Sequence, residues 1–235
     1  MEEDRSGQAE FGINLLRPEA MTTGDWEAIF EVFEASYREA NRSYLEHSIQ
    51  RIGLLALAFD AGNPCAYSVS NFRWMDLPGF EEPQLVVLHG MRCVNPSLRH
   101  RGLSGLLARK VSDEMQLGIS ASGRTVERQL QCGRHGHASG TGGRPELGTV
   151  PRWGHTPTEW QQAVGLKVAE AFGSNLDPTT FVCVGPGTPI GYPNQEFEAT
   201  EAELGAWAPV NRARGDNLLV MNWTPTPPPG WVESV

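Results

Sequence analysis

One stretch of the chain, residues 84–117, limits the possible folds more than any other. It begins with QLVVLHGMRCV, an apolar run that is typical of a buried strand. After Gly102 apolar residues recur at the three- and four-residue spacing of a helix, at Leu103, Leu106, Leu107, Val111 and Met115. The sequence therefore predicts a strand that passes directly into an amphipathic helix, as in mixed α/β proteins.

The flanking segments extend this pattern. Thr22 and Asp25 form a candidate capping box at the start of a helix. A second box is expected at Thr156–Glu159 and a third start signal at Thr200 and Glu203. The expected strands lie at 12–18, 54–59, 65–74, 84–94, 181–185 and 217–223, and the expected helices at 22–41, 43–52, 102–117, 156–172 and 200–207. With 235 residues, of which 40% are hydrophobic, these elements are expected to share one core.

Three segments are expected to lie outside the regular part of this domain. Residues 1–11 are acidic and polar, and we predict a flexible N-terminus before a domain at 12–223. Residues 118–155 are rich in glycine and aperiodic, so we predict a long insertion that moves over a substrate. Residues 224–235 begin TPTPPPG, which predicts an extended, exposed proline-rich tail.

Charge and composition exclude several classes of function. The net charge of −9 argues against nucleic acid as a partner, and it is compatible with a cationic small substrate. No apolar run is long enough for a membrane span, and the acidic start does not resemble a signal peptide. The four cysteines lie far apart, which favours a reduced, cytoplasmic protein. A homodimer is compatible with the sequence.

Positive charge is concentrated where the strand at 84–94 meets its helix. Arg99, His100 and Arg101 immediately precede Gly102. The first N–H groups of a helix have no partner within it, and the helix dipole makes this end partly positive. A glycine allows close approach to that backbone, so we expect the turn to bind a pyrophosphate.

The same turn resembles the coenzyme A signature of the GNAT acyltransferase superfamily, V-x-P-x-x-R-x-x-G-x-[GA]. The matching residues are Val94, Pro96, Arg99, Gly102 and Ser104. The order of elements is also similar over 12–117, and more loosely over 180–223. Ser104 departs from the glycine or alanine of the signature, although Gly105 follows it. The long interval before residue 181 departs as well.

The resemblance implies a mixed α/β fold, a single GNAT-like domain in which helices flank a mixed sheet, with an insertion after the coenzyme A-binding helix. It further implies an N-acyltransferase that moves an acetyl or other short acyl group from acyl-CoA to a primary amine by direct attack, without a metal. A small-molecule amine is the preferred acceptor. The residues implied in coenzyme A binding are Arg92, Cys93, Val94, Arg99, His100, Arg101, Gly102, Leu103, Ser104 and Gly105. A longer acyl chain, a carrier-protein donor, or a module that senses acyl-CoA without turnover remain alternatives.

The resemblance also suggests catalytic residues. His89 lies on the signature strand and is the expected general base, because an imidazole titrates near neutral pH; a strand histidine satisfied by its neighbours is the alternative. Tyr192 is the loosely matched candidate for protonating the leaving thiolate. Cys93 is expected to be a core residue. Cys132, His135 and His137 have metal-ligand spacing but lack a fourth local ligand, so no metal site is predicted.

Overall fold

The computed structural model describes residues 11–142 and 144–232. Within these residues the helices are α1 (Thr23–Ser36), α2 (Arg42–Ile52), α3 (Leu103–Ala121), α4 (Glu159–Phe172) and α5 (Glu201–Trp207). The strands are β1 (Gly12–Leu16), β2 (Tyr37–Arg38), β3 (Leu55–Asp60), β4 (Asn63–Met75), β5 (Gln84–Val94), β6 (Gln129–His135), β7 (Asn175–Asp177), β8 (Val182–Val184), β9 (Tyr192–Pro193) and β10 (Asn217–Thr224).

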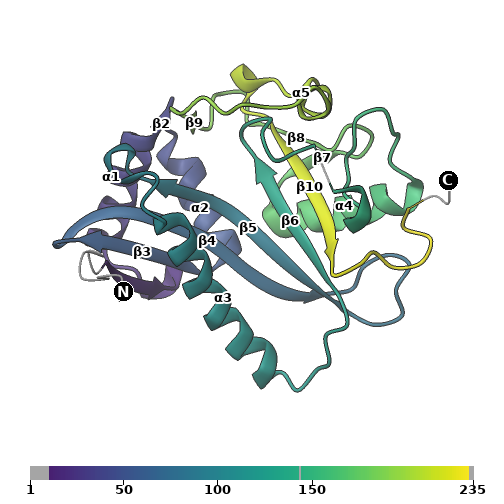
Figure 1. Cartoon of the computed structure of the whole chain (residues 1–235), viewed down its shortest axis with the longest axis horizontal. Helices are drawn as coiled ribbons and strands as arrows, with labels where there is room; N and C mark the ends of the chain where they lie inside the picture. Colours follow the sequence, from purple (N-terminus) through teal and green to yellow (C-terminus); the bar gives the residue numbers. More distant parts are fainter. Residues whose placement is uncertain (1–10, 143, 233–235) are drawn as a thin grey trace, which may run out of the picture.

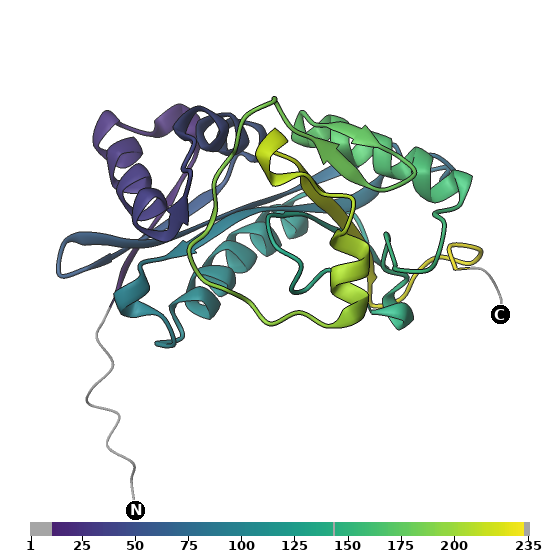
Figure 2. The same cartoon turned by 90° about the horizontal axis from the view of Figure 1, so that it is seen from above.

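A single large sheet organises the chain, with strand order β1-β3-β4-β5-β6-β10-β8-β7 (Figure 1). Every neighbouring pair is antiparallel except β5 and β6, which run parallel. Helices α1, α2 and α4 cover one face, and α3 covers the other (Figure 2). The predicted mixed α/β fold, a mixed sheet flanked by helices, is confirmed.

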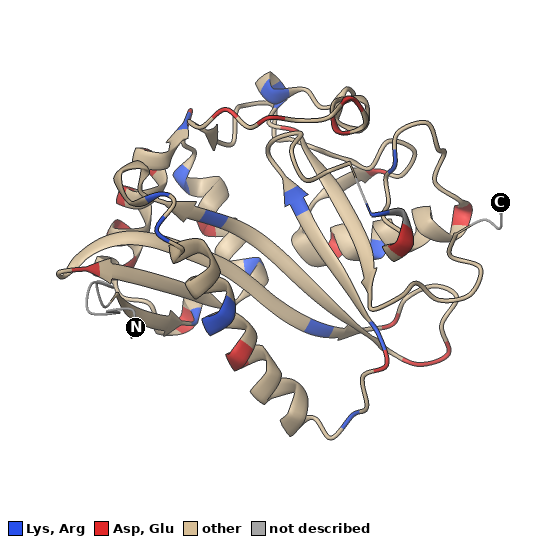
Figure 3. Ribbon diagram, in the orientation of Figure 1, with Lys and Arg blue, Asp and Glu red and all other residues tan. Residues whose placement is uncertain are grey.

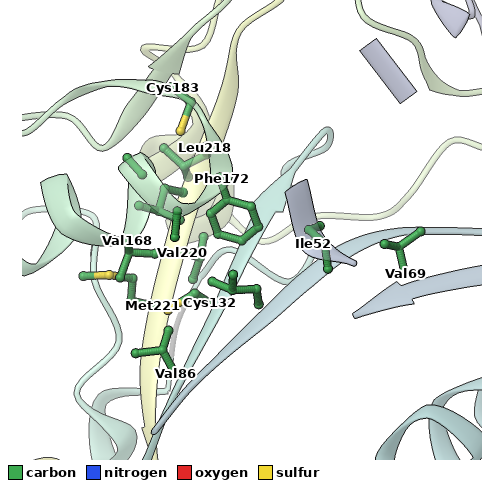
Figure 4. Packing of buried hydrophobic residues seen from close by; sticks show 14 of the residues in the cluster. Ile52, Val69, Val86, Cys132, Val168, Phe172, Cys183, Leu218, Val220 and Met221 are labelled. Carbon is green, nitrogen blue, oxygen red and sulfur yellow. The ribbon is translucent and has the colours of Figure 1, made fainter. Parts of the chain in front are cut away.

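Each face of the sheet has its own hydrophobic core. The larger core joins α1, α2 and α4 to the sheet; Val168 and Phe172 of α4 pack there near Leu218 and Val220 of β10 (Figure 4). The smaller core is formed by the apolar side of α3, with Leu103 and Leu107 packing near Val87. The apolar stripe predicted for α3 is therefore its buried face.

Two helix starts are as predicted and one is shifted. The boxes at Thr22 and Thr200 are both present. In α4 the box is formed by Thr158 and Gln161, two residues later than expected. The Thr158 hydroxyl accepts from the Gln161 N–H, and the Gln161 side chain accepts from the Thr158 N–H at 2.9 Å. Pro157 therefore precedes the N-cap and does not occupy the first helical position.

The interval 118–155 differs from the predicted insertion. Helix α3 continues to Ala121, and Gln129–His135 form β6, which lies between β5 and β10 in the sheet. Leu130 and Cys132 are buried in the larger core, whereas Gln129 and Gln131 point to the opposite side of the strand. A central strand with a polar face was hidden by its glycine-rich surroundings.

The proline-rich segment is also more ordered than predicted. Trp231 is completely buried and packs edge-on against Trp223 and Trp160. Its indole N–H donates to the Gly148 carbonyl at 2.7 Å. Burial of a large aromatic ring outweighs the extended tendency of the prolines before it, so the chain folds back onto the domain. The predicted N-terminal segment 1–11 lies, except for Phe11, outside the described residues.

An irregularity in β5 opens the sheet. Ser68 of β4 faces Arg92, but Ser70 faces His89, so two residues of β5, Gly90 and Met91, lie opposite one residue of β4. Such a bulge bends its strand. The parallel pairing of β5 with β6 ends at His89, although β5 runs on to Val94. Beyond the bulge the two strands separate, as Figure 1 shows.

Candidate active site

The predicted phosphate-binding turn lies at the start of α3. Gly102 is the N-cap in a left-handed conformation (φ 75°), and no side chain caps the helix. Among the described residues none accepts the N–H groups of Gly102, Leu103 or Ser104, whereas the Gly105 N–H donates to the Gly102 carbonyl. A Cβ atom on Gly102 would project into open space. The turn therefore presents unpaired backbone donors to an approaching anion.

A cavity of about 400 Å³, which we call the outer hollow, lies against this turn. Most of the predicted coenzyme A-binding residues line it: Arg92, Cys93, Val94, Arg99, His100, Gly102, Leu103 and Ser104. Arg101 and Gly105 do not. Arg101 lies 3.9 Å from the Asp60 carboxylate and over the Phe11 ring, so its charge is directed toward the β3–β4 hairpin.

A basic residue at the end of β5, Arg92, is hydrogen-bonded to the start of α3. Lys and Arg residues, blue in Figure 3, lie on β5 and on the turn before α3. The Arg92 guanidinium donates to the Ser104 hydroxyl at 3.2 Å and to the Ser68 hydroxyl at 3.4 Å. The serine that departs from the family signature thus has a role here, since it holds a cation of β5 beside the helix start.

A second cavity, the inner hollow, has a volume of about 310 Å³ and lies farther into the opening between β5 and β6. It is lined from β5 by Gly90 and Met91, from β6 by Arg134 and His135, and from β10 by Asn217. Tyr37, Arg92 and His137 line both hollows. The two cavities therefore meet at these three residues.

A strap, residues 185–200, helps to enclose both cavities. It crosses from β8 to α5 on the outside of the sheet (Figure 2) and contributes Gly191 to the inner hollow and Phe197 to the outer one. Its strand β9 pairs with β2, where Tyr37 faces Pro193. Gly191 has φ 98°, and a side chain there would collide with Phe33. The strap is therefore fitted closely against the end of α1.

His137 has the properties of a base at the meeting point of the hollows. Its ring stacks on Phe197 with 4.2 Å between ring centroids. Its Nδ1 is buried and has no partner among the described residues. Burial, and to a lesser degree the nearby Arg212 guanidinium, lowers the pKa of His137. Its neutral form therefore prevails at pH 7, with an available lone pair.

His89, the predicted base, is placed differently. Its Nε2 lies 2.6 Å from Gln131 Oε1 and its Nδ1 lies 3.3 Å from Ser70 Oγ. Gln131 Oε1 can only accept, so Nε2 carries the ring proton and Nδ1 accepts from the serine hydroxyl. Burial lowers the pKa of His89 as well. His89 borders the inner hollow, but both its nitrogens are occupied within the sheet.

Tyr192, the predicted proton donor, is not brought to the site. It is 1% exposed, and its hydroxyl lies 3.0 Å from both the Arg212 and the Asp216 carbonyl oxygens. It lines neither hollow. Tyr37 is the tyrosine that borders both, and burial raises the pKa of its phenol well above the usual value.

The cysteines are core residues. Cys93 donates to the Tyr67 hydroxyl, and burial raises the pKa of its thiol to about 12. Cys132 is fully buried in the larger core, where burial raises its pKa too. At neutral pH both thiols are protonated, so Cys93 is not an activated nucleophile.

No described helix is long and apolar enough to cross a membrane.

The fold and the site together place two joined cavities between separated strands of a mixed sheet, beside a helix start with unpaired backbone N–H groups. No family model and no curated protein matches the sequence. Among solved structures, a chain of the NatC complex bound to Gag peptide and CoA is 15% identical, with a TM-score of 0.38 and coverage of 57% of this chain and 80% of that one. An aminoglycoside N-acetyltransferase in complex with CoA is 14% identical, with a TM-score of 0.36 and coverage of 70% and 87%.

A ribosomal-protein-alanine N-acetyltransferase from Brucella melitensis is 18% identical, with a TM-score of 0.34 and coverage of 52% of this chain and 79% of that one. Two of these three structures are named as N-acetyltransferases, and two of them contain CoA. Because identities and TM-scores are this low, the function has to be inferred from this chain's own residues.

Proposed function

We propose that the chain is a GNAT-type N-acyltransferase that binds acyl-CoA in the outer hollow and a small primary amine in the inner hollow. The observation that carries this proposal is the meeting of the two hollows where β5 separates from β6. One hollow ends at an uncapped, basic helix start in a segment that resembles a coenzyme A signature, and Tyr37, Arg92 and His137 line both hollows.

The residues of the outer hollow fit coenzyme A. The N–H groups of Gly102, Leu103 and Ser104 would bind the pyrophosphate, and Arg92 and Arg99 add positive charge. Past the bulge, β5 has a free edge toward β6, where an extended molecule with amide groups can bind as a further strand does. Acyl-CoA supplies a thioester, whose carbonyl carbon is open to attack by an amine.

Side chains of the protein would then accept and donate the protons of the reaction. His137, neutral at pH 7, accepts a proton from the acceptor's ammonium group, directly or through a water. The amine nitrogen bonds to the carbonyl carbon and then loses its second proton, the carbon–sulfur bond breaks, the sulfur gains a proton, and the products are an amide and free thiol. Tyr37 is protonated at neutral pH and is the candidate to donate its proton to the departing sulfur and to regain one from the proton that the nitrogen loses.

Two roles predicted from the sequence are revised in this proposal. His89 becomes a positioning residue, because it joins β4 to β6 through Ser70 and Gln131 across the base of the opening. Tyr192 becomes an anchor of the strap, because its hydroxyl is bonded to two backbone carbonyls. A longer-chain or carrier-protein donor and a non-catalytic acyl-CoA sensor are the alternatives, and a cytoplasmic enzyme remains our expectation.

The central test combines turnover with a matched pair of variants. The protein is incubated with acetyl-CoA and pooled primary amines, and thiol release and acylated products are measured by absorbance and mass spectrometry. Gly102→Glu places a carboxylate in the phosphate-binding turn. Gly123→Glu is the control, because Gly123 is also left-handed (φ 66°), has open space around it, and follows the other end of α3.

We expect acylated amines from the wild type and from Gly123→Glu, and loss of both coenzyme A binding and turnover in Gly102→Glu. Equal coenzyme A affinity in the two folded variants would refute the assignment of the outer hollow. Binding of acetyl-CoA without turnover of any amine would favour the sensor. A panel of acyl donors, free and attached to a carrier protein, separates the remaining alternatives.

A further inference from the structure

The side chains that line the inner hollow indicate which class of acceptor it would bind. This inference rests on the proposed function. Two arginines line the inner hollow, Arg92 and Arg134. The three histidines of the lining have lowered pKa values and are neutral at pH 7, and none of the described residues that line it is acidic. A polycationic acceptor would meet repulsion here and no compensating carboxylate. The local charge is therefore opposite to the overall charge of −9, which was compatible with a cationic substrate.

Arg134 is a cation held in place without an anion. Its guanidinium donates to Ser174 Oγ at 2.9 Å and to Ser48 Oγ at 2.8 Å, and it lies over the rings of Tyr44 and Phe172. Among the described residues no carboxylate forms an ion pair with it. A guanidinium has five N–H donors, so three remain after the two serine bonds. The chain thus keeps an ordered, partly buried cation at the wall of the hollow.

Beside Arg134 lie two further polar groups whose hydrogen-bonding capacity is incomplete. Asn217 is 4% exposed and lines the hollow, and its Oδ1 has no partner among the described residues. Its Nδ2 donates to the Tyr44 hydroxyl at 2.9 Å. Tyr44 accepts this bond, so its own O–H is available to donate. A buried acceptor without a partner costs stability unless a ligand or water supplies a donor.

We infer that the acceptor is an amine that also carries a carboxylate close by, as a free amino acid does. The carboxylate would pair with Arg134 and accept from the Tyr44 hydroxyl, and an N–H of the acceptor would donate to Asn217 Oδ1. A volume of about 310 Å³ suits a molecule of that size. The cationic wall discriminates against amines that lack the carboxylate, because Arg134 is then desolvated by the bound acceptor without gaining an anionic partner.

The test compares matched acceptors. Initial rates of acetyl-CoA turnover are measured with the common α-amino acids, with their carboxamides, and with short peptides that begin with the same residues. The carboxamide keeps the amine and the side chain and lacks only the negative charge. We expect kcat/KM to be at least ten times higher for the best amino acid than for its carboxamide, with the difference mainly in KM.

Variants assign that preference to Arg134. Arg134→Met should reduce the amino acid's advantage over its carboxamide at least tenfold while coenzyme A affinity, measured by calorimetry, is unchanged. Arg17→Met, at an exposed position after β1, is the control and should keep the advantage. If Arg134→Met does not fold, Tyr44→Phe removes only the hydroxyl, keeps the ring beneath the guanidinium, and should weaken the preference by a smaller factor.

These measurements distinguish a failure of the acceptor assignment from a failure of the proposed acyltransferase function. Acylation of amino acids, carboxamides and peptides with equal efficiency would overturn the inference and leave the acyltransferase intact. Should no amine be acylated, thermal unfolding with millimolar amino acids or their carboxamides decides the matter. A rise in Tm confined to the amino acids and lost in Arg134→Met supports the site, and no such rise overturns it.

Discussion

The acid sensitivity of folding can be predicted from one histidine, His135, at the end of β6. Burial, with smaller contributions from His137 and His89 nearby, lowers the pKa of His135 from its ordinary 6.5 to about 4. In the unfolded chain the same imidazole takes up a proton as the pH falls below 6.5. Between these values the unfolded state binds more protons than the folded state, so the free energy of unfolding decreases as the pH falls.

The size of this effect follows from the difference in pKa. A difference of one in pKa corresponds to about 1.4 kcal/mol, so His135 would destabilise the fold by about 3 kcal/mol between pH 6.5 and pH 4. The contribution of His135 to the free energy of unfolding is fully present above pH 6.5. It is lost as the pH falls toward about 4, the pKa of His135 in the folded state. This is a large part of the roughly 5–15 kcal/mol that stabilises a typical domain.

The assay is urea unfolding at several pH values between 7.5 and 4.5. His135→Gln keeps a polar side chain of similar length but cannot titrate, and His100→Gln at the exposed turn before α3 is the control. Other groups add their own pH dependence, so the informative quantity is the difference between variant and wild type. We expect His135→Gln to lose stability less steeply with acid. Identical slopes in wild type and His135→Gln would refute the reasoning.

His137→Ala should lower kcat by about 10²–10⁴-fold with little change in coenzyme A affinity, and wild-type kcat should rise with pH through a pKa below 6.5; a variant with unchanged kcat would exclude His137 as the base. Cys93→Ala should retain turnover, because the thiol is protonated at neutral pH and is not the nucleophile. For the same reason, the wild type should remain active after treatment with a thiol-alkylating reagent. Tyr37→Phe should slow turnover more than Tyr192→Phe, whereas Tyr192→Phe should mainly lower the Tm. Trp231→Ala should reduce the free energy of unfolding by about 3–5 kcal/mol, measured by urea unfolding; a change below 1 kcal/mol would show that the last segment does not stabilise the domain.

The junction of β5 and α3 could be predicted from the sequence because its signals are local. The change of period at Gly102, the proline before it and the apolar stripe of α3 all lie within one short segment. Capping boxes are local for the same reason, since the two bonded residues are three apart. The apolar stripe of α3, which is a strong local signal, is also the face that packs against the sheet.

Strand β6 was missed although a signal existed. Gln129, Leu130, Gln131 and Cys132 alternate between polar and apolar, which is the period of a strand with two different faces. Only four residues carry this alternation before Gly133 interrupts it. The polar face is explained by its partner, since Gln131 binds His89 on the neighbouring strand, and that pairing cannot be seen in the sequence.

The inner hollow could not be predicted, because its groups come from distant segments. Tyr44 lies on α2, Arg134 on β6 and Asn217 on β10, and their meeting depends on the order and register of strands. His137 was visible only as part of a metal-like spacing with Cys132 and His135. In the structure Cys132 belongs to the core, whereas His137 stacks on the strap.

One local irregularity links the fold to the proposed chemistry. The bulge at Gly90 and Met91 bends β5, and the pairing of β5 with β6 ends there. A sheet that separates in its middle leaves backbone donors and acceptors unpaired, which costs stability unless water or a ligand satisfies them. The strap alone does not satisfy them, because its strand pairs with β2 and not with β5. The opening therefore remains available to an extended, amide-containing ligand, and the hollows on either side of it can hold the two reactants next to His137.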